Sequence, residues 1–135
     1  MHLGDIITIH VLRSLFWENS AGPMFEVTST GNLSLYGIIL DGCHMTKESI
    51  NPAITSEGTL SLSACELQNN KISSNNAVVY INSGTLSISD TNITVDANSG
   101  GNALYLEEGV NYSINNQSGT SETDLSYKAI TAESI

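Results

Sequence analysis

The chain has 135 residues, enough for one domain with a hydrophobic core, and its 14 Asp and Glu against four Lys and Arg give a formal net charge of −10. A negative field of this size repels phosphate backbones and anionic lipid headgroups, so we expect no binding to nucleic acid. No run of about 18 apolar residues is present, so we expect no membrane insertion by this segment, and the N-terminal residues lack the pattern of an export signal.

In chain order, the predicted elements repeat. A glycine followed by an alternating apolar pattern occurs at Gly4, Gly31, Gly58, Gly84 and Gly109, as in the sequences Gly-Asn-Leu-Ser-Leu and Gly-Thr-Leu-Ser-Leu of the second and third copies. The glycines are separated by 25 to 27 residues, and the copies cover nearly the whole chain. A period of this length is typical of solenoid proteins, in which each repeat is one supersecondary unit.

Each complete copy predicts three short strands, because apolar and polar residues alternate in three places. In the copy around Gly31, Phe25 and Val27 precede the glycine, and two further apolar segments follow it. Aligning the copies gives three columns of expected core residues: Leu33, Leu60 and Leu86; Leu35, Leu62 and Ile88; and Leu40, Leu67 and Ile93. Clusters rich in Asn, Ser and Gly, such as residues 68–70, lie between the strands and are expected to form turns.

A single copy cannot bury its own apolar face, so successive copies must stack with their strands in parallel. We therefore predict an all-β fold, a right-handed parallel β-helix (solenoid) of about five rungs over residues 1–117, with the handedness taken from the crossover rule. A β-sandwich is the structural alternative, but its turns come every 8 to 12 residues or so, without this long repeat. Residues 118–135 are expected to form an acidic polar tail or a frayed last rung. No capping element is evident at either end, so we expect a fragment of a longer solenoid.

Two parts of the chain resemble known β-helix repeats. Residues 22–42 resemble a rung of bacterial surface-adhesin β-helices, in which an apolar strand, a Ser/Thr-Gly turn, a Leu-Thr-Leu-like strand and an Ile-x-Leu-Asp-Gly strand follow one another. Residues 100–109 and 67–70 are similar to the Gly-Gly-Ala-Ile and Phe-x-x-Asn motifs of chlamydial polymorphic outer-membrane proteins. This resemblance, over roughly residues 4–115, implies a pectate-lyase-like fold and a passenger segment of an autotransporter-like adhesin.

Catalytic and metal-binding patterns are not evident, so we expect no enzymatic activity, no metal and no cofactor. Enzymes with this fold need basic residues or clustered carboxylates on one face, whereas Lys47, Lys71 and Lys128 occupy unrelated phases of the repeat. Cys43 and Cys65 are expected to be buried thiols, and a single bridge between neighbouring rungs is the alternative.

Two sets of outward-facing residues are candidates for binding. In the strand before Gly84, Tyr80 lies between two apolar residues that point inward, and the same reasoning places Tyr105 outside on the next rung. Stacked tyrosines suit sugar rings, whose faces are apolar and whose rims are polar. Ser61 and Ser87 belong to an outward column of hydroxyl groups that could hydrogen-bond a glycan. Ordinary solvated faces with cross-strand stabilisation are the alternative for both sets.

We therefore expect a non-catalytic structural and adhesive segment of a secreted or cell-surface protein, whose faces contact glycans or host surface proteins. The alternative is a fragment of a carbohydrate-active β-helix, a polysaccharide lyase or hydrolase, with its catalytic rungs outside this chain. A third hypothesis is end-to-end self-association through exposed strand edges.

Overall fold

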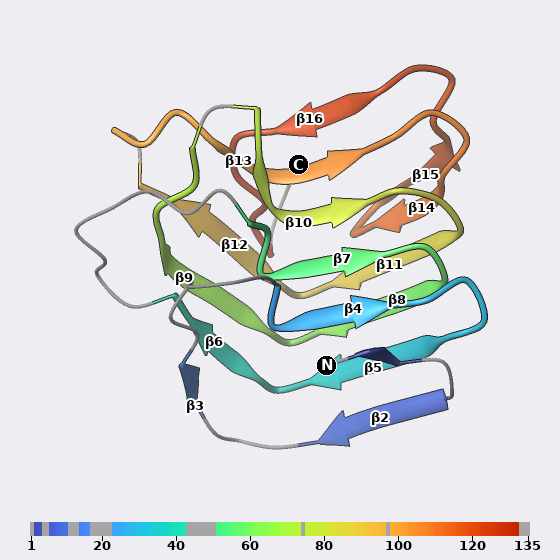
Figure 1. Ribbon diagram of the computed structural model, residues 1–135, viewed down its shortest axis with the longest axis horizontal. Coiled ribbons are helices and arrows are strands. Elements are labelled where there is room, and N and C mark those ends of the chain that lie inside the picture. Colours follow the sequence, from blue (N-terminus) through green and yellow to red (C-terminus); the bar gives the residue numbers. More distant parts are fainter. Residues whose placement is uncertain are drawn as a thin grey trace.

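The computed structural model describes residues 2–3, 6–10, 14–16, 23–42, 51–73, 75–96 and 98–132, with side chains from residue 23 onward. The described residues form 16 β-strands and no helix (Figure 1). The strands lie in three sheets, which form the walls of a β-solenoid. The expected all-β solenoid is therefore confirmed.

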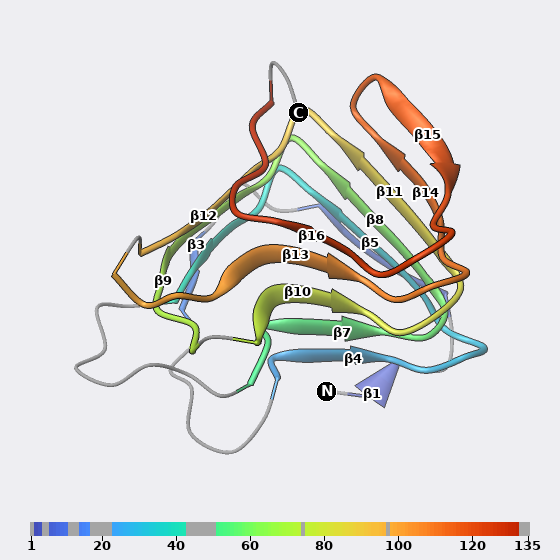
Figure 2. The same cartoon turned by 90° about the horizontal axis from the view of Figure 1, so that it is seen from above.

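The three sheets enclose the core between them (Figure 2). Sheet A contains β1 (His2–Leu3), β4 (Phe25–Val27), β7 (Ile54–Ser56), β10 (Ala77–Ile81), β13 (Asn102–Leu106) and β16 (Leu125–Tyr127). Sheet B contains β2 (Ile6–His10), β5 (Asn32–Tyr36), β8 (Thr59–Ser63), β11 (Thr85–Ser89), β14 (Asn111–Ile114) and β15 (Gln117–Thr120). Sheet C contains β3 (Ser14–Phe16), β6 (Ile39–Asp41), β9 (Glu66–Asn70) and β12 (Asn92–Val95).

Successive rungs pair in parallel, with equivalent residues opposite one another. Leu33 lies opposite Leu60, and Leu60 lies opposite Leu86. Within each rung the chain passes from sheet A to sheet B and then to sheet C, turning anticlockwise as it rises toward the viewer in Figure 2. The solenoid is therefore right-handed, as the crossover rule predicts.

The solenoid has about three turns, fewer than the five rungs expected. Three coils, made of β4 to β6, β7 to β9 and β10 to β12, have all their strands described with side chains. The first copy begins at Gly4, which lies outside the described residues. The last copy supplies β13 and β14 but no third parallel strand, because the chain reverses direction after Ile114.

The interior is a stack of aliphatic side chains. The nine residues of the three expected columns are all buried, and none is more than 1% exposed. Because the register places equivalent residues opposite one another, each leucine packs against leucine or isoleucine in the neighbouring rungs. Burial of this apolar stack is what holds the rungs together.

One expected turn is instead the end of a strand. Residues 68–70 continue β9, and the register shifts between Ile93 and Val95, so β9 carries one more residue than β12. Asn69, at this β-bulge, has a left-handed backbone with a φ of 56°. The bulge turns Asn70 into the core, where its side-chain amide donates to the backbone oxygen of Thr94 at 3.2 Å.

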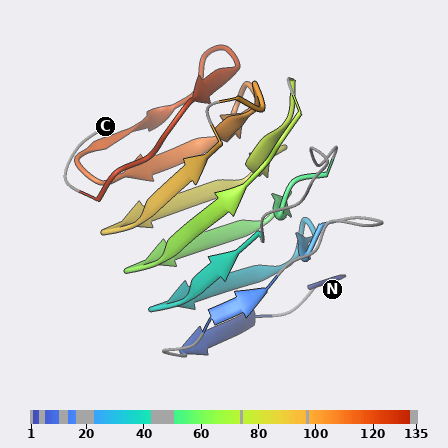
Figure 3. The ribbon, with the colours of Figure 1, turned by 90° about the vertical axis from the view of Figure 1, so that its left-hand side faces the viewer.

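Residues 117–132, which we call the C-terminal cap, fold back over the last rung (Figure 3). Strand β15 pairs antiparallel with β14, and β16 pairs antiparallel with β13. The buried Ile130 exchanges backbone hydrogen bonds with Ile93 of β12 at 2.9 and 3.0 Å. The segment is therefore neither a free tail nor a frayed rung, and the expectation that neither end carries a capping element is wrong at this end.

Candidate functional site

Tyr80 and Tyr105 form a stacked pair on the outer face of sheet A. The two residues lie opposite each other in β10 and β13. Their ring centroids are 4.9 Å apart, and the ring planes are inclined by 11°. Both side chains are partly exposed, whereas their apolar neighbours along each strand are buried. The structure thus places the two tyrosines together on the outside of the solenoid.

Carboxylate groups hold the hydroxyl groups of this pair. The Tyr105 hydroxyl donates to Oδ2 of Asp124 at 2.6 Å, and Oδ1 of the same carboxylate accepts the backbone N–H of Glu108 at 2.9 Å. The hydrogen bond between Tyr105 and Asp124 raises the pKa of Tyr105 and lowers the pKa of Asp124. Burial, together with a hydrogen bond to Glu107, raises the pKa of Tyr80 to about 12. Both phenols are therefore protonated at neutral pH, and their rings are held in one orientation.

A shallow hollow of about 240 Å³ lies beside the tyrosine pair on the same face. Thr55, which lines the hollow, lies opposite Tyr80 on the following rung and opposite Glu26 on the preceding rung. The hollow is lined by Glu26, Val27, Thr28, Thr55, Glu57 and Asn82. Hydroxyl, amide and carboxylate groups therefore line a hollow on the same face as the tyrosine pair.

Ser61 and Ser87 lie on a different wall. They are opposite each other in β8 and β11, within a serine column that runs along the outer face of sheet B. Ser61 is partly exposed and Ser87 is exposed. The structure does not bring these serines near the tyrosines, because sheets A and B form separate walls. A ligand that contacts both sets would have to wrap around an edge of the solenoid.

The described residues contain no arrangement suited to metal binding. No group of three or more His, Cys, Asp or Glu side chains in the described part could hold a metal ion. Cys65 is a free, buried thiol that donates to the backbone oxygens of Leu35 at 3.4 Å and Ser63 at 3.3 Å. Burial raises the pKa of this thiol, which makes it less reactive. Cys43 lies outside the described residues.

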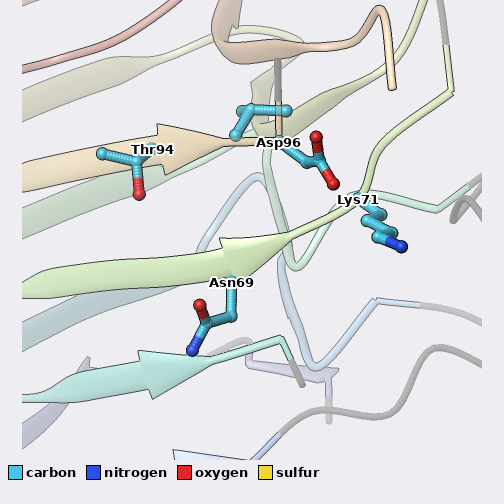
Figure 4. Close-up of a pocket in the computed structure, with 5 residues that line it drawn as sticks. Asn69, Lys71, Thr94 and Asp96 are labelled. Atoms are coloured by element: carbon cyan, nitrogen blue, oxygen red, sulfur yellow. The ribbon is translucent and has the colours of Figure 1, made fainter. Parts of the chain in front are cut away.

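Two further hollows adjoin at the bulged end of sheet C. One, of about 240 Å³, is lined by Asn69, Lys71, Thr94, Val95 and Asp96 (Figure 4). The other, of about 420 Å³, is lined by Val95, Asp96, Gly100, Gly101, Lys128 and Ala129. They share Val95 and Asp96, and we call them together the sheet C hollow.

Sequence reasoning missed the grouping in the sheet C hollow because Lys71 and Lys128 occupy unrelated phases of the repeat. The bulge displaces Lys71 from the phase that the repeat predicts, and the antiparallel reversal of the C-terminal cap brings Lys128 back to this wall. The same reversal brings Asp124 to the tyrosine pair. No local sequence signal marks the bulge or the reversal of the chain.

Comparison with protein families, curated protein sequences and solved structures found no match for this chain. Among the described residues, no helix is long and apolar enough to cross a membrane.

Proposed function

We propose that this chain is a non-catalytic structural and adhesive β-solenoid segment of a secreted or cell-surface protein, and that the outer face of sheet A contacts glycans. The observation that carries the proposal is the stacked pair of Tyr80 and Tyr105, whose side chains are partly exposed on the outer face of sheet A. An aromatic ring offers an apolar surface to the CH face of a sugar, and nearby polar groups bind the hydroxyl groups of its rim.

The surroundings of the pair provide such polar groups in fixed positions. Asn82 donates its side-chain amide to Glu107 at 3.2 Å, and the Asp124 carboxylate is held by two donors. Because these groups are already ordered, a bound sugar loses less free energy to their immobilisation. Stacked rungs form a stiff support for this face, and the resemblance to surface-adhesin rungs supports an extracellular setting.

The proposal is tested by binding of the purified chain to a glycan array, followed by affinity measurement with the best ligand. We expect Tyr80→Ala to weaken binding about fivefold or more, because aromatic stacking contributes about 1 kcal/mol or more when a ring surface is covered. Tyr36→Ala is the matched control, since Tyr36 is 51% exposed but lies on sheet B, and it should leave affinity unchanged.

Tyr105→Phe separates stacking from the contact with Asp124. This variant keeps the ring but removes the hydroxyl that donates to the carboxylate. We expect it to bind glycan nearly as well as the wild type, whereas Tyr105→Ala binds more weakly. Failure of the wild type to bind any glycan, or full binding by both alanine variants, would contradict the proposal.

A further inference from the structure

The positive charges of the described residues gather at one end of sheet C. The chain has four Lys and Arg residues, of which Arg13 and Lys47 lie outside the described residues. The two that are described, Lys71 and Lys128, line adjoining parts of the sheet C hollow. The whole protein carries a net charge of −10, which repels anions. At this end of sheet C, the two ammonium groups instead attract an anionic group.

The two ammonium groups differ in how they are engaged. Within the described residues, the Lys71 side chain takes part in no hydrogen bond or ion pair, and Figure 4 shows its ammonium group projecting outward. Lys128 donates to the backbone oxygens of Gly100 at 3.3 Å and Gly101 at 3.4 Å. The Lys71 ammonium group can therefore pair with a ligand. The Lys128 ammonium group, in the other part of the hollow, is already held by backbone oxygens.

The bulge in β9 gives the hollow its shape. Its extra residue interrupts the pairing of β9 with β12 beside Asn69 and Thr94, and the pairing resumes at Asn70 and Val95. The Asn69 amide donates to both carboxylate oxygens of Asp41 at 3.1 and 3.0 Å, which fixes its orientation. Bulges often redirect side chains beside binding sites.

We propose that the sheet C hollow binds a single acidic sugar residue that carries a carboxylate and an N-acyl group at the end of a glycan. The carboxylate pairs with Lys71, and the sugar hydroxyls donate to Asp96 and Thr94. The acyl methyl group packs against the apolar side chains of Val95 and Ala129. The two parts of the hollow, about 240 and 420 Å³, suit one or two sugar units.

Asp96 favours a sugar over an acidic peptide as the ligand. Its Oδ1 accepts the backbone N–H of Asn98 at 2.9 Å, and the carboxylate also lines the hollow. A ligand with several negative charges is repelled by this carboxylate, whereas a sugar with one carboxylate and several hydroxyls supplies donors to it. The site lies on a different wall from the tyrosine pair, so this proposal does not depend on the proposed function.

Titration of the ¹⁵N-labelled full chain with sialyllactose, monitored by NMR, tests the proposal, and lactose is the matched ligand without the acidic sugar. The salt concentration is about 0.15 M, where the Debye length of about 8 Å limits long-range repulsion. We expect sialyllactose, but not lactose, to shift the amide resonances of Asp96, Gly100 and Gly101. Lys71→Met should weaken binding about tenfold or more, because it removes a charge-assisted hydrogen bond.

Thr85→Glu is the control for net charge. It makes the same change of one charge unit on the exposed outer face of sheet B, and it should leave the affinity within about twofold, because that face is a different wall of the solenoid and salt screens exposed charges. Tyr80→Ala should also leave sialyllactose binding unchanged, which separates this proposal from the first. The proposal is overturned if sialyllactose shifts no resonance of the hollow, if lactose shifts them equally, if Lys71→Met binds like the wild type, or if only an acidic peptide binds there.

Discussion

At the scale of single residues, the repeated glycines allow neighbouring rungs to approach closely. A methyl group placed on Gly58 would lie 2.3 Å from the backbone oxygen of Thr28, and one placed on Gly84 would lie 2.0 Å from that of Gly58. Gly84 also has a φ of +87°, a conformation that L-residues rarely adopt. Gly109 has a φ of +94°, but no atom lies within 4 Å of the place a methyl group would occupy.

This difference predicts unequal effects of alanine at the two positions. Gly109→Ala should cost about 1–2 kcal/mol of unfolding free energy, from backbone strain alone. Gly84→Ala should cost about 1–3 kcal/mol more, because the added methyl group also overlaps the preceding rung. Urea denaturation followed by circular dichroism measures both values. Equal losses in the two variants would show that rung contact at Gly84 is unimportant.

The leucine columns predict a second residue-level effect. Leu60 is 0% exposed and lies between Leu33 and Leu86, so Leu60→Ala leaves a cavity in the middle of the stack. We expect a loss of about 2–5 kcal/mol. Thr59→Ala, at the neighbouring and partly exposed position, should change stability by less than about 1 kcal/mol. The same denaturation experiment compares them, and a similar loss in both variants would argue against the columnar core.

At the scale of elements, the strands of the repeat could be predicted, but two other features could not. The positions of β5, β8 and β11 follow from alternating leucines and serines, because one face of each strand is buried. Strand β15 has no such pattern, since all four of its residues are exposed, and its pairing with β14 is decided by tertiary structure. The bulge in β9 was hidden because Asn69 and Asn70 are also typical turn residues.

The contribution of the contact between β13 and the C-terminal cap to stability should depend on pH, because Asp124 takes part in that contact. Its pKa is lower in the folded chain than the usual value of about 3.9, because the carboxylate accepts the Tyr105 hydroxyl. A lowered folded-state pKa means that the carboxylate adds stability above the unfolded-state pKa. This contribution is lost as the pH falls through the folded-state pKa.

NMR can follow this titration through the Glu108 amide proton, which donates to the same carboxylate. We expect its chemical shift to change with a midpoint below the usual Asp pKa of about 3.9. Asp124→Asn should abolish the transition and make the chain less stable than the wild type near neutral pH. The difference in stability between the two proteins should shrink as the pH falls through the folded-state pKa of Asp124. A midpoint at or above the usual value would contradict the hydrogen-bonded arrangement.

At the scale of the whole molecule, the C-terminal cap converts an open stack into a closed end. Parallel strands leave unpaired N–H and C=O groups at the last rung, where a further chain could add. Strand β16 covers the edge of β13, β15 covers the edge of β14, and Ile130 bridges to β12. We therefore expect the cap to hinder the end-to-end association through this end that the sequence predicts.

Removing the cap should expose these edges and cause self-association. A variant that ends at Asn116 loses β15, β16 and the buried Ile130, so the edges of all three sheets become available to another chain. Size-exclusion chromatography with light scattering should show a mass that rises with concentration, whereas the full chain stays at a lower and constant mass. Adding Ser113→Lys to the shortened chain places a charge on the exposed β14 edge and should reduce the association. A shortened chain with the same constant mass as the full chain and an unchanged circular dichroism spectrum would show that the cap does not protect this end.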